Sequence, residues 1–159
     1  MSSVIKFMKV RPDAVLPIIA TEGSAGFDLA WCPSEEGKRG LINGNSIALD
    51  SSGTSYEPHH TFETGIAAAI PKGFVGLVFS RSGHGFHANV RLANCVGVID
   101  SDYRGEIRAK MTIDSGFHRF QIGERVAQLV VVPYLSVAEE VTAFEMTERG
   151  EKGYGSTGK

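Results

Sequence analysis

The apolar residues of this chain fall into short runs that are separated by glycine-marked turns. The runs are rich in Val, Ile and Phe, which favour strands, and no long stretch shows the i, i+3, i+4, i+7 spacing of an amphipathic helix. We expect strands at residues 4–10, 64–70, 74–79, 95–99, 106–113, 126–135 and 137–144. Many short strands at regular spacing predict an all-β barrel or sandwich. At most one short helix is expected, after Arg81-Ser82-Gly83.

Two segments differ in character from the rest. Residues 31–63 are rich in Gly, Ser, Asn, Pro and Asp around one apolar island at 46–49, which predicts a long surface excursion outside the catalytic pocket, with room for one strand of its own. Residues 148–159 carry four glycines and one large apolar residue, Tyr154, and such a segment cannot fold alone. It is either a disordered tail or a flexible lid that becomes ordered when a ligand binds. Residues 1–147 then form a single domain.

Composition narrows the possible partners. The 159 residues include 16 Lys and Arg against 18 Asp and Glu, so there is no basic surplus for non-specific nucleic-acid binding. No apolar run has the length of a membrane span, and the first residues lack the apolar core of a signal peptide. We expect a cytoplasmic protein (in the host cytoplasm if the source is viral) with free cysteines, Cys95 lying in the core.

The segment Arg81-Ser82-Gly83 is a candidate phosphate site. It follows a predicted strand, and Gly83 and Gly85 permit positive φ, so successive backbone N–H groups can face an anion. Arg81 adds a planar cationic fork and Ser82 a hydroxyl donor. The alternative interpretation is a solvated turn.

Residues 97–106 are a candidate catalytic segment. An apolar strand runs directly into Asp100, and the end of a buried strand is where a carboxylate can be partly desolvated and rigidly aimed, as a general base requires. The alternative is a polar hairpin turn, because Asp and Gly also begin and end turns.

The C-terminal segment places an aromatic residue among glycines. Tyr154 on such a strap can stack on a flat ring, and the hydroxyls of Ser156 and Thr157 can then reach phosphate oxygens. The alternative is a frayed terminus.

Together with two further segments, these stretches resemble the trimeric dUTP diphosphatases (dUTPases), whose five motifs all appear here in order. The five matching segments are residues 25–30, Arg81-Ser82-Gly83 with 71–76 before it, 97–106, 123–129 and 149–158. The resemblance covers essentially the whole chain. It implies a distorted jelly-roll-like barrel and a homotrimer in which three subunits build each site.

The resemblance also implies roles for individual residues. Asp100 would activate a water for in-line attack on the α-phosphate of dUTP, giving dUMP and pyrophosphate, which lowers dUTP and supplies dUMP for thymidylate synthesis. Tyr103 would pack under the deoxyribose and exclude a 2′-hydroxyl. Asn94 and the strand backbone at Gly97 would read the uracil edge. Asp28 would reach Mg²⁺ through its water shell, as suits a cation that dehydrates reluctantly.

The remaining implied contacts concern the phosphates and the lid. Arg149 would meet the γ-phosphate and Tyr154 would stack on uracil. The other residues expected to bind substrate are Arg81, Ser82, Gly83, Gln128, Gly155, Ser156 and Thr157.

The sequence departs from the family at several positions. His84-Gly85 stands where the second motif usually continues Leu-Ala, and Lys152 and Tyr154 stand where the fifth has glycine and phenylalanine. The segment 31–63 is longer than usual. The five histidines show no metal-ligand spacing, so we expect no zinc site.

Two rival functions stay open from the sequence. A dCTP deaminase shares the fold, but that family generally has a second serine after Arg-Ser and a glutamate base, where this chain has Gly83 and Asp100. A β-rich regulatory module is the other rival, with residues 31–63 as its contact surface for a partner protein.

Overall fold

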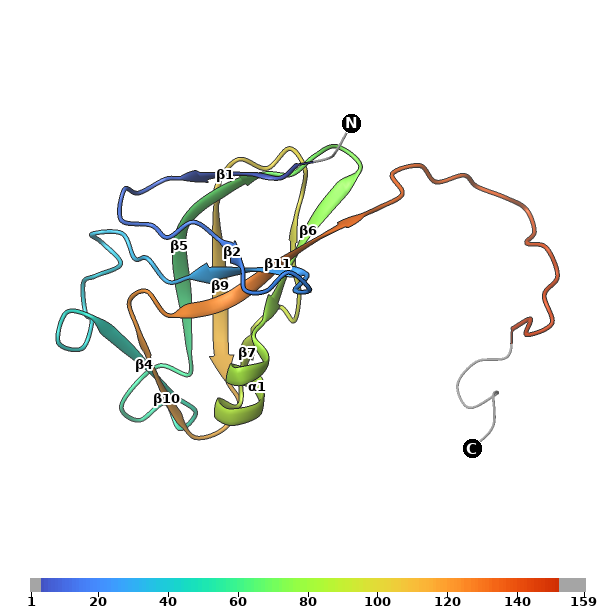
Figure 1. The fold of residues 1–159 in the computed structure, drawn as a ribbon. Helices are drawn as coiled ribbons and strands as arrows, with labels where there is room; N and C mark the ends of the chain where they lie inside the picture. Colours follow the sequence, from blue (N-terminus) through green and yellow to red (C-terminus); the bar gives the residue numbers. More distant parts are fainter. Residues whose placement is uncertain (1–3, 152–159) are drawn as a thin grey trace.

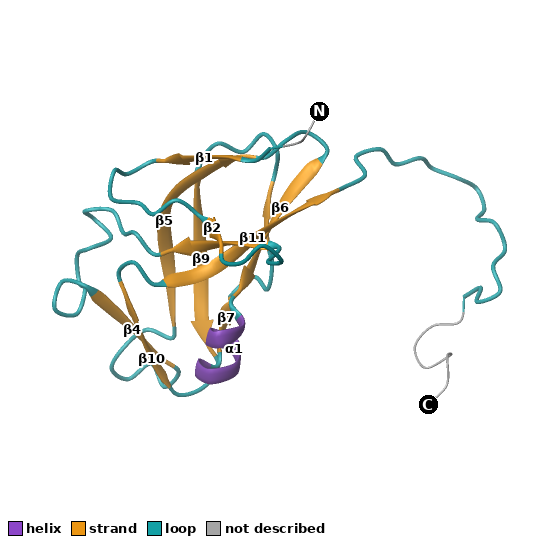
Figure 2. Cartoon of the chain, viewed as in Figure 1, coloured by secondary structure: helices purple, strands orange, loops and turns teal. Residues whose placement is uncertain are grey.

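The computed structural model describes residues 4–151, which fold into three β-sheets around one hydrophobic core (Figure 1). Figure 2 shows that strands dominate and that α1 is short. The elements are β1 (Lys6–Lys9), β2 (Ile18–Ile19), β3 (Gly26–Ala30), β4 (Ser46–Asp50), β5 (His59–Ala69), β6 (Phe74–Ser80), α1 (Ser82–Ala88), β7 (Val90–Leu92), β8 (Gly97–Ile99), β9 (Glu106–Ile113), β10 (Phe117–Gln121) and β11 (Arg125–Pro133). The predicted all-β class with one short helix is confirmed.

The strand order decides which distant segments become neighbours. One sheet has the order β1-β5-β9-β7, a second pairs β10 with β4, and the third has the order β2-β3-β11-β6-β8. Strand β9 shows why the chain folds this way: buried residues at 107, 109, 111 and 113 alternate with outward-facing Arg108 and Lys110. The buried face packs against fully buried Phe62 and Leu129 of the other strands in the same core.

Residues 31–63 are not a surface excursion, and that prediction is wrong. Trp31, Leu49 and Phe62 are essentially fully buried in the main core. The segment contributes β4, which pairs with β10, and the first half of β5, which pairs with β9. Polar turns separate these strands, so the average composition hid the apolar positions that enter the barrel. The apolar island at 46–49 does coincide with β4.

The segment after β11 leaves the body of the protomer as an extended arm (Figure 1). The strand predicted at 137–144 is absent: no strand of this chain pairs with it among the described residues. Leu135, Val137, Phe144 and Met146 are between 87% and 99% exposed. The apolar alternation is real, but its burial requires a surface other than this protomer.

Two smaller predictions have different outcomes. Cys32 is buried and free, whereas Cys95 is exposed, in a turn with φ 63°, so its placement in the core was wrong. Among residues 4–151, no helix has the length and apolar character to cross a membrane. The cytoplasmic location stays a prediction.

Candidate active site

The strand order β3-β11-β6 assembles three of the predicted motifs into one hollow. Asp28 of β3 lies directly opposite Gln128 of β11, and Arg81 and Ser82 follow the end of β6, the next strand of the sheet. These four residues line a hollow of about 350 Å³, called here the Asp28 hollow. Segments separated by up to 100 positions therefore meet because of sheet pairing.

Asp28 organises the charges of this hollow. Its Oδ1 accepts a hydrogen bond from Arg81 Nε at 3.0 Å, and its Oδ2 accepts one from Arg125 Nη1 at 2.9 Å. The Asp28 side chain is only 12% exposed, so its charge is largely shielded from water and needs these partners. The carboxylate thus binds two guanidinium groups, that of Arg81, which lines the hollow, and that of Arg125. Arg125 lies inside the fourth motif, but we had predicted no role for it.

The Gln128 amide is held by close packing. Its Nε2 donates to the Ser80 carbonyl at 3.0 Å. Its Oε1 lies so close to Gly26 that a Cβ at that position would approach within 2.7 Å. Glycine at position 26 is therefore needed for this amide to keep its place between β3 and β6.

The segment after Arg81 forms helix α1 and not a left-handed glycine turn. Neither Gly83 nor Gly85 has positive φ, so the predicted reason for these glycines is wrong. A Cβ at Gly83 would meet no atom within 4 Å, so the helix backbone there is open to an approaching group. The short helix that we predicted after Arg81-Ser82-Gly83 is confirmed, but it already begins at Ser82.

A second, larger hollow lies beside β8 and β9. It measures about 750 Å³ and is called here the Asp100 hollow. Four residues that we predicted to contact the nucleoside or the attacking water line it, namely Asn94, Gly97, Asp100 and Tyr103. All four come from one continuous stretch of chain, β8 and its flanking turns.

Tyr103 is held in this hollow by the turn that follows β8. Its hydroxyl donates to the Glu106 carbonyl at 3.1 Å, and its N–H donates to the Asp100 carbonyl at 3.2 Å. A Cβ at Gly105 would fall 2.3 Å from the Tyr103 hydroxyl. The Arg-Gly sequence that ends the third motif thus makes room for the ring.

Two carboxylates line the Asp100 hollow, and only one of them is already paired. Glu106 accepts hydrogen bonds from Arg11 at 2.5 Å and from the Gly65 N–H at 2.6 Å. The bond to Glu106 is the main reason that the pKa of Arg11 is raised. Among residues 4–151, no hydrogen bond or ion pair involves the Asp100 carboxylate, so its lone pairs are available to a water.

Asp100 is exposed within one protomer, which differs from the partial desolvation that we expected. The reason is that β8 is an edge strand, paired only with β6, and its Val98 is 63% exposed. The desolvation of Asp100 therefore depends on what covers this edge.

The two hollows lie at opposite ends of β6. Strand β8 runs antiparallel to β6 with Ile99 opposite Gly76, which places Asp100 beside the start of β6, whereas Arg81 follows its last residue. At 3.2–3.4 Å per residue, this separates the two groups by about 20 Å along the strand. No residue lines both hollows.

The fifth motif lies almost entirely beyond the described part of the chain. Tyr154, Gly155, Ser156 and Thr157 are outside the described residues, and the roles expected for them stay predictions. Arg149 is within the described arm and is exposed.

Comparison with known proteins assigns the chain to a family. The dUTPase family profile matches residues 52–158. The "Deoxyuridine 5'-triphosphate nucleotidohydrolase" of Syntrophotalea carbinolica is 37% identical over 157 residues, covering 97% of this chain and 96% of that protein. The protein of the same name from Wolinella succinogenes is 38% identical, with 98% and 94% covered.

Solved structures agree with this assignment. The Staphylococcus bacteriophage 80alpha dUTPase with dUPNHPP superposes with a TM-score of 0.78 at 25% identity, covering 99% of both chains. A dUTPase from phage phi11 of S. aureus, studied for the coordination of a structural Mg(II) ion, has a TM-score of 0.70 at 20% identity over 90% of this chain and 99% of its own. The fold is the jelly-roll-like barrel of these enzymes, and the chain belongs to the dUTPase family.

Proposed function

We propose that this protein hydrolyses dUTP to dUMP and pyrophosphate. The observation that carries the proposal is the unpaired Asp100 carboxylate, which shares a hollow with Asn94 and Tyr103 in a chain of the dUTPase family. A water oxygen attacks the α-phosphorus in line, and Asp100 accepts the proton of that water. The bond from the α-phosphorus to the bridging oxygen breaks, and pyrophosphate leaves.

The Asp100 hollow would bind the nucleoside. Asn94 and the edge-strand backbone at Gly97 offer hydrogen-bonding groups to uracil, because β8 leaves one side of its backbone unpaired. The Tyr103 hydroxyl donates to the Glu106 carbonyl, and the missing Cβ at Gly105 leaves space for the ring. The ring would lie against the deoxyribose and leave no room for a 2′-hydroxyl. Because the strand backbone at Gly97 has a fixed shape, it would disfavour binding of bases that carry the 5-methyl of thymine or the amino group of cytosine.

The Asp28 hollow would bind the triphosphate. Arg81 offers a planar fork, and Ser82, the Gly83 backbone and the Gln128 amide add hydrogen-bonding groups. Arg125, held by the same carboxylate as Arg81, adds a second cation. This arrangement supports the fourth motif as a phosphate contact.

Mg²⁺ would join the same hollow. Asp28 is the one acidic residue among the described residues that line it, and both of its oxygens already accept arginine N–H groups. That environment fits contact with Mg²⁺ through water, with the nucleotide supplying the direct oxygen ligands. The ion, when bound, neutralises phosphate charge.

A complete site would need more than one copy of the chain. A general base must lie within hydrogen-bond reach of the attacking water, yet Asp100 and Arg81 of one protomer are about 20 Å apart along β6. A second copy placing its Asp28 hollow against the exposed β8 edge would complete the site and shield Asp100. The exposed apolar arm from Leu135 to Met146 is a further surface that another copy would cover. A homotrimer is the arrangement that we propose.

The residues from 148 onward would close this site. We infer a lid from their composition: Tyr154 would stack on uracil, Arg149 would meet the γ-phosphate, and Gly155, Ser156 and Thr157 would approach the phosphates. Ordering costs about 1–2 kcal/mol per residue, whereas one stacked ring returns about 1–3 kcal/mol. The triphosphate must therefore supply most of the closure. Amide exchange with a non-hydrolysable dUTP analogue and with dUMP tests this, and equal protection of the segment in both states contradicts it.

The defining experiment is an assay of pyrophosphate release with Mg²⁺ and either dUTP or dCTP. Release from dUTP at a rate far above that from dCTP is the expected result. Ammonia release from dCTP would instead indicate the deaminase, and failure to convert either nucleotide would favour a partner-binding module. Membership in the dUTPase family already disfavours both rivals.

A further inference from the structure

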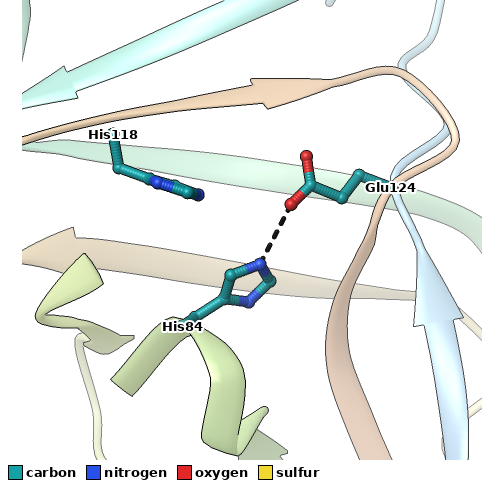
Figure 3. A group of neighbouring side chains, drawn as sticks. All are labelled: His84, His118 and Glu124. Atoms are coloured by element: carbon teal, nitrogen blue, oxygen red, sulfur yellow. Dashed lines mark hydrogen bonds and ion pairs between the residues drawn. The ribbon is translucent and has the colours of Figure 1, made fainter. Parts of the chain in front are cut away.

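Three side chains outside both hollows converge at the lower end of the barrel. His84 comes from α1, His118 from β10, and Glu124 from the turn between β10 and β11. One nitrogen or oxygen of each lies within 4.8 Å of the other two, and Figure 3 shows both rings and the carboxylate facing one another. The three residues are separated by 34 and 6 positions, which matches no metal-ligand pattern, so no zinc site was expected from the sequence.

His84 is buried, His118 and Glu124 are half-buried, and neighbouring residues hold all three in place. His84 is 7% exposed, and both imidazoles pack edge-on against the fully buried ring of Phe120, with centroid distances of 5.0 and 4.5 Å. The Glu124 carboxylate is oriented by a second hydrogen bond, because its Oε2 accepts the Gln121 backbone N–H at 3.1 Å. Core packing therefore positions the two imidazoles, and a turn positions the carboxylate.

An ion pair alone does not account for this arrangement. His84 Nε2 lies 3.0 Å from Glu124 Oε1, which satisfies those two groups. His118 Nε2 is buried and has no hydrogen-bond partner among the described residues. A buried nitrogen without a partner is unfavourable, whereas a cation shared by the three groups would use it.

We propose that His84, His118 and Glu124 bind a divalent transition-metal ion, with Zn²⁺ as the best match. Two imidazoles and one carboxylate form a common zinc ligand set, and a water or other small ligand would complete the tetrahedron. At metal–ligand distances near 2.1 Å the ligand atoms lie about 3.4 Å apart, so the His84–Glu124 pair would widen slightly from 3.0 Å on binding the ion. The site is distinct from that of Mg²⁺, which prefers oxygen ligands.

The position of the site gives it a structural role. His84 is two residues from Ser82, and Glu124 directly precedes Arg125, so a bound ion would join the two chain segments that carry the phosphate contacts. It would touch no substrate atom. The proposal does not depend on dUTP hydrolysis.

The test uses untagged, chelator-treated full-length protein without nucleotide. Zn²⁺ is titrated by calorimetry in excess Mg²⁺, and Co²⁺ is titrated with its visible d–d absorption as a report of tetrahedral coordination. We expect one ion per chain and a rise in Tm on Zn²⁺ addition. His118→Gln keeps size and polarity and should weaken binding by more than the roughly 10–100-fold that loss of an outer-shell partner costs. His84→Leu restores a core side chain of the kind usual in the family and should also abolish the site.

The matched control is His87→Gln, which changes an exposed histidine one turn along the same helix. It should bind Zn²⁺ like the original protein. Equal stoichiometry and affinity in the original chain and in folded His118→Gln would overturn the proposal. So would loss of binding in His87→Gln, or the absence of any Zn²⁺-dependent heat, spectrum or Tm change.

Discussion

The Asp100 hollow and the Asp28 hollow are built in different ways. The Asp100 hollow comes largely from one continuous stretch of chain, from Leu92 through β8 to the start of β9, in which backbone hydrogen bonds and Gly105 position a few groups. The Asp28 hollow draws on three distant segments that meet only because β3, β11 and β6 are neighbours, and a shared carboxylate holds its cations. The first hollow is set by local geometry and the second by long-range pairing and charge.

This difference has a functional consequence. Shape discrimination between bases and sugars suits a strand and turn held by local hydrogen bonds, whereas a triphosphate is bound by charged groups that must be kept in place before it arrives. Because the two hollows lie at opposite ends of β6, the proposed assembly assigns them to different sites, and each protomer would contribute a different half to each site. The predictions below separate these two contributions.

The largest effect is expected at Asp100. Asp100→Asn keeps the shape of the side chain but removes the base, so kcat should fall by roughly 10²–10⁴-fold. Binding of a non-hydrolysable analogue, measured by calorimetry, should change little because the phosphate contacts are in the other hollow. The matched control is Asp102→Asn, two residues away and outside the lining of the hollow. Near-normal turnover in Asp100→Asn would exclude it as the base.

A smaller effect on catalysis is expected from a change at Asp28, mainly as a rise in the KM for dUTP. Asp28→Asn leaves Arg81 and Arg125 without their shared partner, and hydrogen bonds to charged groups of this kind correspond to a change of about 10- to 100-fold. Asp114→Asn is the control, because it breaks an exposed pair with Arg91 of similar geometry, which contributes little. A steady-state analysis that finds kcat alone reduced in Asp28→Asn would argue against its role in holding the phosphate contacts.

The next prediction concerns sugar selection. Tyr103→Ala should raise activity on UTP relative to dUTP by roughly tenfold or more, because the ring no longer excludes a 2′-hydroxyl. Gly105→Ala should produce a similar change with Tyr103 intact, because the new Cβ displaces the ring. Discrimination against dTTP should persist in both variants. If both discriminate against UTP as strongly as the original enzyme, the steric role of Tyr103 is wrong.

The smallest effect is a difference in salt dependence. Raising the ionic strength from about 0.05 to 0.5 M should weaken binding of the triphosphate analogue several-fold, because salt screens the partly exposed arginines. Binding of deoxyuridine, which would reach only the Asp100 hollow, should hardly change. If the affinities of the two ligands fell equally with ionic strength, the assignment of base and sugar recognition to one hollow and of phosphate charge to the other would be wrong.

Sequence patterns predicted the local features well. Strand β9 has the predicted bounds because its alternation is uninterrupted, and the short helix expected after Gly83 is present as α1, although it begins earlier, at Ser82. The group formed by Asp100, Tyr103 and Asn94 could also be predicted from the sequence, because all three residues lie in one stretch of chain. The five motifs pointed to the family before any geometry was known.

Features that depend on distant pairing were missed. Strand β10 was not predicted, because its polar residues hide a pattern that only pairing with β4 explains. Arg125 and the cluster around His84 could not be found by spacing, since their partners are brought close by the fold. The prediction of a strand at 137–144 was wrong for the opposite reason: the apolar pattern is strand-like, but its burial requires another surface.

The most direct test of the divided site mixes two inactive chains. Asp100→Asn and Arg81→Ala are coexpressed in equal amounts, and mixed oligomers are verified by native mass spectrometry. If each site takes Asp100 from one copy and Arg81 from another, random assembly leaves about a quarter of the sites with both groups intact, so about a quarter of the original dUTP turnover should return. Mixed oligomers as inactive as either parent would show that one chain supplies both groups, which contradicts the account.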